Sequence, residues 1–504
     1  MGLQTTAVAV PGTRSSSSGW PVSRGYAWIV FALSFGLLLS DYMSRQVLNA
    51  VFPMLKDEWL LTDARLGSLS GVVALMVGVL AFPLSLVADR WGRVKSLLFA
   101  AVTWSLATLG CALAANYDQM FLARLLVGVG EAAYGSVGIA VVLSVFPIVL
   151  RATLSGAFIA GGAFGSVLGV SIGGAVAQQF GWRWAFGAMG LFGLVLAAVY
   201  GVVVTEKRLR PRAEADTADD ADGAGTPAAE AAAPRAALRA LLPRLFSSVS
   251  VISAYVGSGL QLFIAGSLIS WLPSFFNRYY DLPTAKAGAA AGVFVLIIGI
   301  GMVLGGMASD RISKVVPIRK WDVALTCSLG SLLLLMTAFR LPTGPLQLIT
   351  LAAGALLTAG SAGPAAAMVA NLTPVAISAT AFATLTLANS LLGLAPGPAV
   401  TGALADRTGL LGALRIVPLV ALAAAVAFLI GRRRYDRDLL RITGLARATA
   451  PTDAEPGPTG TETADTEPAD AEPADQEAPA AEAAAETATD LDRTAGQKEA
   501  ETTA

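Results

Sequence analysis

Twelve apolar stretches, each long enough to cross a lipid bilayer, follow one another between Tyr26 and Gly431. A helix of ~20 apolar residues is ~30 Å long, which matches the hydrocarbon core of a membrane. Backbone groups in lipid must be hydrogen-bonded within the chain, so each stretch is expected to form a helix. The sequence therefore predicts an all-α integral membrane fold. The expected spans are 26–48, 66–88, 96–115, 120–146, 152–177, 184–204, 248–276, 285–308, 321–340, 346–370, 376–404 and 411–431.

Charge is scarce and unevenly spread along the chain. Charged residues make up 14% of the sequence, against about 25% in soluble domains. The formal net charge is zero, but residues 451–504 contain 15 acidic and two basic residues. A basic membrane domain is therefore followed by an acidic tail. This tail is expected to be disordered, because it has too few apolar residues to form a core.

The loops predict the orientation in the membrane. If the N-terminus is cytoplasmic, the inner segments up to Arg441 contain 22 Lys and Arg residues and the outer loops contain eight. Positively charged loops favour the cytoplasmic side. An even number of spans then places both termini in the cytoplasm. The Arg-rich and Ala-rich composition favours a bacterial chain, so the expected location is the bacterial plasma (inner) membrane.

The longest internal loop, 205–247, divides the spans into two sets of six. Its centre is rich in Ala, Asp, Glu and Pro and is expected to be disordered. Its last part, 235–246, is expected to be either an amphipathic surface helix or a charged approach to the seventh span. The predicted organisation is a cytoplasmic tail 1–25, a six-helix bundle 26–204, a linker 205–247, a second six-helix bundle 248–431 and an acidic disordered tail 432–504.

The two halves repeat each other. Asp89 and Arg90, which end the second span, match Asp310 and Arg311, which end the eighth. Glycines in the second, fifth, eighth and eleventh spans also recur at matching offsets. Secondary transporters are built from such repeats, with the binding site between them.

Two motifs of the first half resemble those of the major facilitator superfamily. The connection from Ser85 to Lys95 resembles the family pattern G-x-x-x-D-R-x-G-R-(K/R), with Ser85 in place of the first Gly and Val94 before Lys95. The segment from Arg124 to Ala132 matches R-x-x-x-G-x-G-x-A in the fourth span. The resemblance covers roughly residues 26–435. It implies two pseudo-symmetric six-helix bundles that work by alternating access, with spans 1, 4, 7 and 10 around a central cavity.

A third motif lies in the fifth span, where the glycines fit a pattern that the family associates with antiporters. Val170 stands where that pattern has Pro, which weakens an exporter interpretation. These glycines and a Gly-Pro pair in the eleventh span are expected to permit close helix packing and bending during gating. The residues assigned to this role are Gly165, Gly169, Gly173, Gly174, Gly397 and Pro398.

A narrower resemblance leaves two branches of the family open. Asp41-Tyr-Met-Ser-Arg45, together with 126–134, is similar to the spinster-type lipid and lysolipid transporters. Those usually have N-Y-M-D-R in the first span, so Ser44 occupies the position of their Asp. The anion/cation symporter branch has a similar first span and shares the segment Gly181-Trp-Arg-Trp184.

Four charged residues lie well inside the predicted spans: Asp41, Arg45, Arg124 and Glu131. Each costs ~2.5–3.5 kcal/mol in lipid even on the mildest scale. The first two are four residues apart and the last two are seven apart, so each pair shares one face of its helix. In the second half, the most polar interior residues are the uncharged Gln261 and Asn389.

The functional interpretation of these charges is proton coupling. Burial favours the neutral form of a carboxylate and a nearby Arg favours its charged form, so exchange of partners can control protonation. Asp41 and Glu131 are the candidate proton carriers. Arg45 and Arg124 are the candidate substrate-binding groups, because Arg stays charged throughout. The alternative is that each pair is a salt bridge that only neutralises itself within its helix.

The charged cluster that ends the second span, with its repeat, is expected to be a conformational latch. Its Asp should meet the N-terminal end of a neighbouring helix or a basic partner when the cytoplasmic side is closed. The alternative is ordinary positive-inside loop chemistry. The latch residues are Asp89, Arg90, Gly92, Arg93, Asp310 and Arg311.

Other site chemistry is not indicated. The chain has no His and two Cys, Cys111 and Cys327, both in apolar segments, so neither a metal site nor a disulfide is expected. No cofactor, catalytic set or nucleic-acid-binding pattern is expected. The expected partners are the lipid bilayer, protons and a small-molecule substrate, with the protein as a monomer.

The sequence thus predicts a proton-coupled secondary transporter for an anionic or amphiphilic organic solute. One alternative is a drug-type proton antiporter. Another is a non-transporting, transporter-like receptor whose acidic tail recruits a partner. A membrane-embedded enzyme is the weakest alternative, because no catalytic set is apparent.

Overall fold

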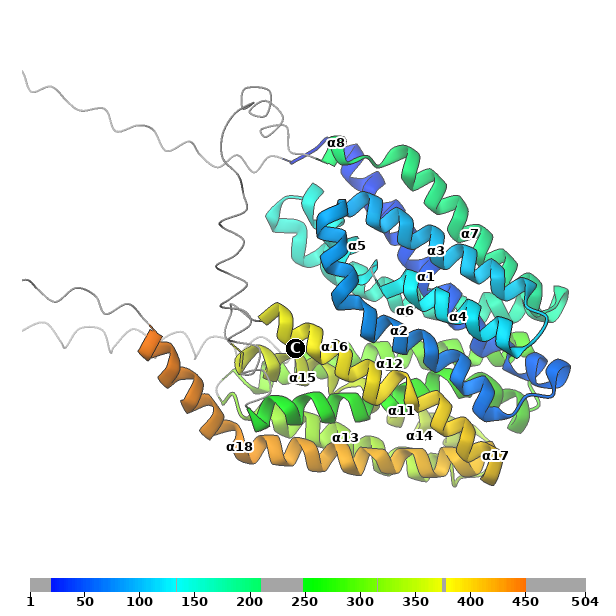
Figure 1. Ribbon diagram of the computed structural model, residues 1–504. Coiled ribbons are helices and arrows are strands. Elements are labelled where there is room, and N and C mark those ends of the chain that lie inside the picture. The colour runs from blue at the N-terminus through cyan, green and yellow to red at the C-terminus, as the bar shows by residue number, and fades with distance from the viewer. Residues whose placement is uncertain (1–19, 133, 210–247, 315, 374–377, 450–504) are drawn as a thin grey trace, which may run out of the picture. The chain divides into compact units, whose positions relative to one another are not determined.

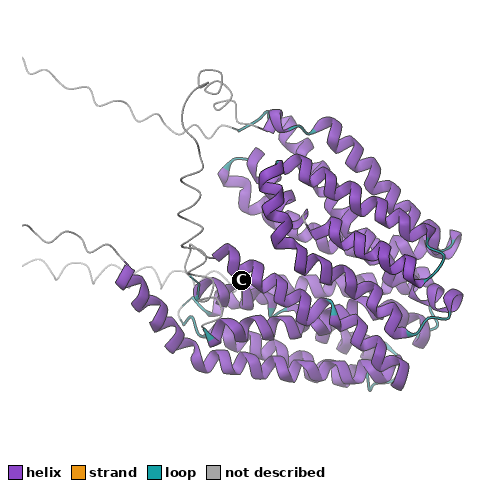
Figure 2. Cartoon of the chain, in the orientation of Figure 1, coloured by secondary structure: helices purple, strands orange, loops and turns teal. Residues whose placement is uncertain are grey.

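The computed structural model of the protein describes residues 20–132, 134–209, 248–314, 316–373 and 378–449. Every regular element in this part of the chain is helical, as Figure 2 shows. It contains 11 helices long and apolar enough to cross a membrane. The longest of these, Thr380–Leu440, covers the last two expected spans, and its backbone leaves the helical region at Gly409, where φ is 75° and ψ is 159°. The predicted all-α membrane fold is confirmed, and division at Gly409 accounts for the twelfth span.

Figure 1 shows the helices as two groups, α1 to α8 in blue to green and α11 to α18 in green to orange. The first group consists of α1 Arg24–Trp59, α2 Asp63–Trp91, α3 Arg93–Leu113, α4 Tyr117–Ala132, α5 Tyr134–Val145, α6 Ile148–Phe180, α7 Trp182–Val203 and α8 Glu206–Leu209. The second consists of α11 Val249–Tyr279, α12 Thr284–Ile312, α13 Arg319–Ala338, α14 Pro345–Ala359, α15 Ala362–Asn371, α16 Ser378–Asn389, α17 Pro396–Ile416 and α18 Val420–Thr449. We refer to these groups as the first and second halves.

The eleventh expected span is not a uniform α-helix. A π-helical turn, Ser390–Leu394, lies between α16 and α17, and the Ala395 amide donates to the Ser390 carbonyl over 2.9 Å. Pro396 and Pro398 have no amide proton with which to continue an α-helical ladder. A wider turn at this point is a local adjustment of the kind that helices make where the regular ladder is interrupted.

The C-terminal boundary differs from the sequence expectation. Residues 432–449 were assigned to the disordered tail, but α18 continues as a helix to Thr449. Contacts within the second half hold its first turns beyond the expected span: Arg432 donates to Asp322 over 2.6 Å, and Tyr435 is 4% exposed. The linker 210–247 and the tail 450–504 lie outside the described residues, as does the possible surface helix at 235–246.

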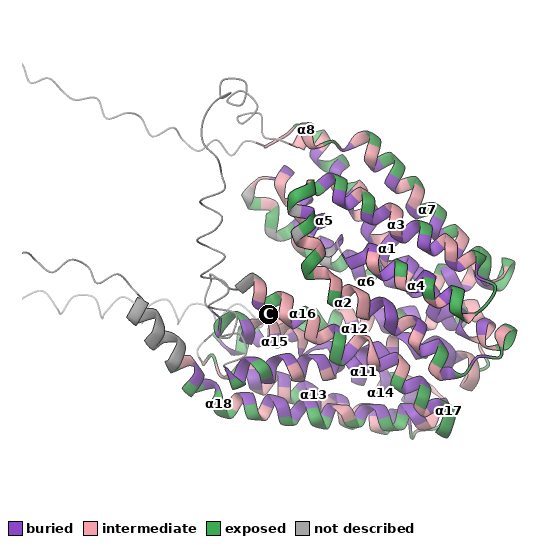
Figure 3. Cartoon of the chain, viewed as in Figure 1, coloured by how far each residue is buried: buried purple, intermediate pink, exposed green. Residues whose placement is uncertain are grey.

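The outward faces of the spans are apolar. On α7, six large hydrophobic residues are more than two-fifths exposed, and Figure 3 shows exposed positions along this helix. They are Trp184, Leu191, Phe192, Val195, Val199 and Val202. A soluble monomer rarely exposes an apolar stripe of this length, so the face fits contact with lipid.

Two helix pairs form the most extensive contacts between the halves: α2 packs on α17, and α6 packs on α12. Glycines permit this approach. A Cβ on Gly67 would strike the carbonyl oxygen of Pro398, and a Cβ on Gly288 would lie 2.6 Å from the carbonyl oxygen of Val170. At these points the backbone of one half therefore lies directly against the backbone of the other.

The two ends of the molecule differ. We call the end at which α1 passes into α2 the closed end, on the right in Figure 1, and the end at which α8 ends and α11 begins the linker end. Among the described residues, all hydrogen bonds between the halves lie at the closed end. One of them runs from the Ala285 amide of α12 to the Gln178 side chain of α6 over 2.8 Å.

Candidate functional site

The four intramembrane charges lie on two neighbouring helices of the first half, α1 and α4. Arg124 is 0% exposed, Glu131 3% and Asp41 4%. The Arg45 side chain is 21% exposed. Arg45 is therefore the member of the group that a solute could reach.

An ion pair joins α1 to α4. Nη2 and Nε of Arg45 lie 2.5 Å and 2.9 Å from the same oxygen of Glu131, Oε2. The other oxygen, Oε1, is buried and has no hydrogen-bond partner in the described residues. The charges thus neutralise each other between helices, and not along one helix as the salt-bridge alternative supposed.

Glycines of α4 determine where Glu131 lies. A Cβ on Gly128 would lie 2.9 Å from the Val73 carbonyl of α2, and a Cβ on Gly130 would lie 2.6 Å from the Trp104 amide of α3. The absence of side chains at these two positions lets α4 sink between α2 and α3. Glu131 is thereby held within reach of Arg45 on α1.

Arg124 has a different environment from Arg45. Its Nη1 and Nη2 each lie 3.0 Å from a backbone carbonyl of α1, those of Ser44 and Arg45, and its Nε lies 3.4 Å from the Leu69 carbonyl of α2. The planar guanidinium group thus connects three helices. All three of its nitrogens donate to backbone carbonyls, and its side chain is fully buried. A substrate therefore cannot contact Arg124 in this conformation, although the sequence predicts a substrate-binding role for it.

Asp41 lies one turn before Arg45 on α1, and its Oδ1 is buried without a hydrogen-bond partner in the described residues. An unpartnered buried carboxylate oxygen is costly. Its position beside the Arg45–Glu131 pair makes it a second candidate for binding a proton.

Uncharged polar residues that sequence reasoning did not single out extend this face of α1. Asn49 donates to Gln46 over 2.6 Å, and Ser70 of α2 donates to Asn49 over 2.6 Å. The Tyr42 ring lies 5.4 Å from the Arg45 guanidinium carbon. The signal was available in the sequence, because polar residues at spacings of three and four share a helix face.

The second half contributes uncharged groups. Gln261 of α11 is 1% exposed, and neither atom of its amide has a partner in the described residues. Asn389, the last residue of α16, has an unpartnered Oδ1. Buried amides without partners cost free energy, and water or a bound solute could supply the missing hydrogen bonds.

Sequence reasoning also missed a polar cluster at the closed end. Asp63, 2% exposed, accepts two bonds of 2.8 Å and 2.9 Å from Arg278 and one of 2.6 Å from Lys56. Asp406 of α17 accepts from the amides of Asp63 and Ala64 over 2.7 Å and 2.9 Å, at the first turn of α2. The sequence shows these residues only as scattered loop charges.

The predicted latch residues lie at the linker end. Arg90, Arg93, Asp310 and Arg311 are exposed, and in the described part of the chain none of them forms an ion pair. The side chain of Asp89 lies outside the described residues. Gly92 has a φ of 96°, and a Cβ there would meet the carboxylate of Glu206 in α8. The latch stays a prediction.

Three glycines assigned to packing lie along α6 where it contacts α1. A Cβ on Gly165 would lie 3.0 Å from the Leu39 carbonyl, one on Gly169 2.7 Å from the Met43 Cα, and one on Gly173 2.6 Å from a Val47 methyl group. The backbones of α6 and α1 therefore lie almost in contact.

The remaining packing residues lie near the boundary between the halves. A Cβ on Gly174 would be 2.9 Å from the Thr284 carbonyl of α12, and one on Gly397 would be 2.5 Å from the Phe263 carbonyl of α11. The carbonyl of Pro398 accepts from the Trp271 indole over 3.0 Å. Their role in gating stays a prediction.

The described residues contain no group of three or more His, Cys, Asp or Glu residues that could hold a metal ion. Cys111 and Cys327 are both buried as free thiols.

Known proteins share this fold and parts of this sequence. The chain superposes with a TM-score of 0.71 on a bacterial homolog of the human lysosomal transporter spinster in an inward-facing, occupied conformation, at 19% identity over 82% of this chain and 99% of that one. It is 24% identical to the D-galactonate transporter of Escherichia coli O6:H1 over an alignment of 428 residues, and this alignment covers 81% of this chain and 96% of the relative. It is 24% identical over 289 residues to the hexuronate transporter of Bacillus subtilis, of which it covers 64%.

A family model completes the comparison. The model described as Major Facilitator Superfamily matches residues 34–319, which include both intramembrane charge pairs and the second Asp-Arg pair at 310–311. The match spans more than half of the chain and agrees with the helical architecture. The chain therefore belongs to the major facilitator superfamily, a family of membrane transporters and not of enzymes.

Proposed function

We propose that the protein is a proton-coupled transporter that moves a small organic anion across the bacterial plasma membrane by alternating access. The observation that carries this proposal is the ion pair between partly exposed Arg45 and buried Glu131. In this proposal, Arg45 is the fixed positive charge that a solute can reach, and Glu131 directly behind it is the group that binds the proton.

The coupling follows from competition for Arg45. A solute carboxylate that binds the guanidinium group replaces Glu131 as its partner. Glu131 would then be a buried, uncompensated negative charge, which is strongly unfavourable. Uptake of a proton removes that charge, so anion binding and proton binding favour each other and both move in the same direction.

Asp41 and Arg124 support this exchange in different ways. Asp41, with its unpartnered Oδ1 one turn from Arg45, is the second proton-binding group. Arg124 holds the α1 backbone at Ser44 and Arg45 and so positions the binding guanidinium group.

The uncharged groups suggest what else the solute carries. Gln261 and Asn389 offer amide donors and acceptors from the second half, and Gln46 and Asn49 offer them from the first. Hydroxyl groups are suitable partners for amides. The names of two relatives, hexuronate transporter and D-galactonate transporter, are those of sugar-acid anions, which combine a carboxylate with hydroxyl groups.

We further propose that this conformation is open toward the cytoplasm. The excess of Lys and Arg in the predicted inner segments supports a cytoplasmic position for the linker end. The halves are joined by hydrogen bonds at the opposite, closed end, and the latch arginines at the linker end are unpaired in the described residues. Both termini are then cytoplasmic.

The test separates coupling from binding. In liposomes with an imposed inward proton gradient, we expect Glu131→Gln to abolish concentrative uptake of hexuronate or galactonate. The same variant should retain exchange of labelled for unlabelled solute, because the neutral glutamine imitates the protonated carboxyl. Arg45→Gln should lose both activities.

Glu58→Gln is the matched control, since Glu58 lies on α1 but pairs with Arg183 away from the charge cluster. It should transport as the wild type does. Full proton-driven uptake by Glu131→Gln would refute the coupling role. Transport of lipophilic cations that is indifferent to Arg45→Gln would favour the drug-type antiporter instead.

A further inference from the structure

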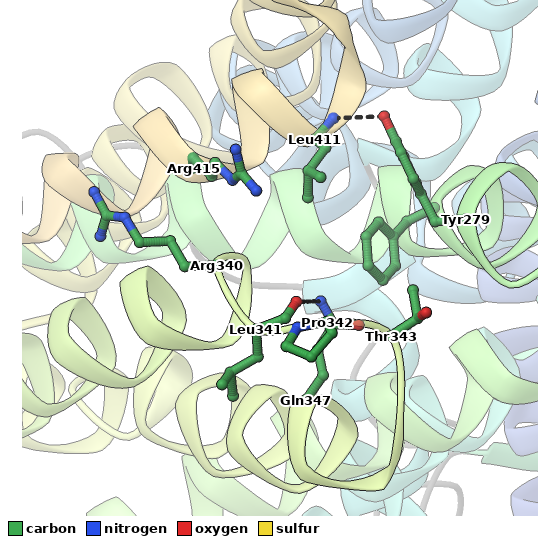
Figure 4. A pocket seen from close by; sticks show the side chains of 9 residues that line it. Tyr279, Arg340, Leu341, Pro342, Thr343, Gln347, Leu411 and Arg415 are labelled. Atoms are coloured by element: carbon green, nitrogen blue, oxygen red, sulfur yellow. Dashed lines mark hydrogen bonds between the residues drawn. The ribbon is translucent and has the colours of Figure 1, made fainter.

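A second cationic site lies away from the charge cluster, at the closed end of the second half. It is a pocket of about 330 Å³ between the end of α11, the α13–α14 connection and the segment that follows Gly409. Figure 4 shows Arg340 and Arg415 on one side of it and Tyr279 on the other. None of the residues that line it is acidic, so the two arginines give it a net positive charge.

Both arginines are oriented by backbone carbonyls. Nε of Arg415 donates to the Phe339 carbonyl over 2.8 Å, and Nη1 of Arg340 donates to the Met336 carbonyl over 3.3 Å. Neither forms an ion pair in the described residues. Each therefore has further N–H groups with which to bind an anion.

The rest of the pocket is held rigidly. The Tyr279 hydroxyl accepts from the Leu411 amide over 3.0 Å, which leaves its own proton available for donation. Gln347, 2% exposed, donates to the carbonyls of Ala338 and Leu341 over 3.0 Å and 3.1 Å and so fixes the α13–α14 connection, as Figure 4 shows in part. A preorganised set of donors loses little freedom when it binds a ligand.

The surroundings of the pocket indicate a lipid. Leu346 and Ile349 of α14, beside Gln347, are 64% and 67% exposed, and Ile416 and Leu419, beside Arg415, are 40% and 48% exposed. The pocket lies where α11 and α13 end, at the depth where the polar headgroups of the bilayer begin. Guanidinium groups match phosphate oxygens in geometry. We propose that this pocket binds the phosphate of an anionic phospholipid, with the acyl chains along the exposed apolar residues of α14 and of the segment 416–419.

The experiment uses the full-length protein purified in a mild detergent. Phosphatidylglycerol, phosphatidylcholine and inorganic phosphate are titrated separately, and the thermal unfolding temperature and the lipids retained in native mass spectra are measured. The variants are Arg340→Gln/Arg415→Gln and a control, Arg407→Gln. Arg407 is an exposed arginine of α17 near the same end that does not line the pocket.

We expect phosphatidylglycerol, and not phosphatidylcholine or inorganic phosphate, to stabilise the wild type and Arg407→Gln. The double variant should lose most of this shift, with an apparent affinity lower by about tenfold or more for the two removed charges. Equal phosphatidylglycerol shifts in the double variant and the control would overturn the site. Stabilisation by inorganic phosphate that only the double variant loses would overturn the lipid assignment in favour of a soluble anion.

Discussion

At the scale of single residues, Arg45 and Arg124 illustrate that two intramembrane arginines of one protein can have different environments. Arg45 faces a carboxylate and is 21% exposed, whereas Arg124 faces three carbonyl oxygens and is fully covered. In the sequence the two residues cannot be distinguished, because each is simply an arginine inside a predicted span. What separates them is the rotation of each helix about its axis, which packing determines.

This difference can be measured. Arg124→Ala should lower the thermal stability substantially, on the order of 2 kcal/mol or more, because charged hydrogen bonds to buried carbonyls are lost. Arg45→Gln should also lower the stability, because it leaves the buried Glu131 without its partner, but unlike Arg124→Ala it should abolish the stabilisation by hexuronate or galactonate. Thermal unfolding with and without solute checks both variants. Arg124→Ala protein of wild-type stability that no longer responds to solute would return Arg124 to a direct binding role.

At the scale of elements, hydrophobicity predicts where the spans are but not how they touch. The spans could be located because lipid permits only internally bonded backbone, and about 20 apolar residues are needed to cross. The pairing of Arg45 with Glu131 could not be predicted, because it depends on α4 sinking against α2 and α3 at Gly128 and Gly130. Similarly, nothing local marks Asp63 as the partner of Arg278, 215 residues away.

The packing of α6 on α1 makes a prediction at this scale. Alanine at position 169 would bring its Cβ to 2.7 Å and 2.8 Å from the Met43 backbone, so the helices must separate. We expect Gly169→Ala to destabilise the first half by about 1–3 kcal/mol, as overpacking does. Gly187→Ala on α7 is the control, because nothing lies within 4 Å of its Cβ position. Thermal unfolding should show a loss only for the first variant, and equal stability of the two would contradict the tight packing of α6 on α1.

At the scale of the whole molecule, charged residues are paired across the halves at the closed end and exposed to solvent at the linker end. At the closed end, Asp63 lies between Lys56 and Arg278, and Asp406 binds the first turn of α2. At the linker end, the latch residues Arg90, Arg93, Asp310 and Arg311 are exposed. Alternating access requires that bonds at one end break as bonds at the other end form. The closed-end cluster should therefore act as the counterpart of the predicted latch.

Asp63→Asn tests this relation, because the amide keeps the size of the side chain but loses the charge that holds Arg278 and Lys56. We expect the population to shift toward a state that is open at the closed end, by about 5–150-fold, the range for couplings of 1–3 kcal/mol. Spin labels at Val149 and Ile312 should report a shorter distance across the linker end, and labels at Leu60 and Leu346 a longer one across the closed end. All four residues are exposed, and the two buried cysteines can be replaced beforehand.

Glu58→Gln is the control, because it breaks an ion pair within the first half at the same end, and it should change neither distance. If the closed end opens in Asp63→Asn while the linker end stays unchanged, the two ends are not coupled and the reciprocal latch fails.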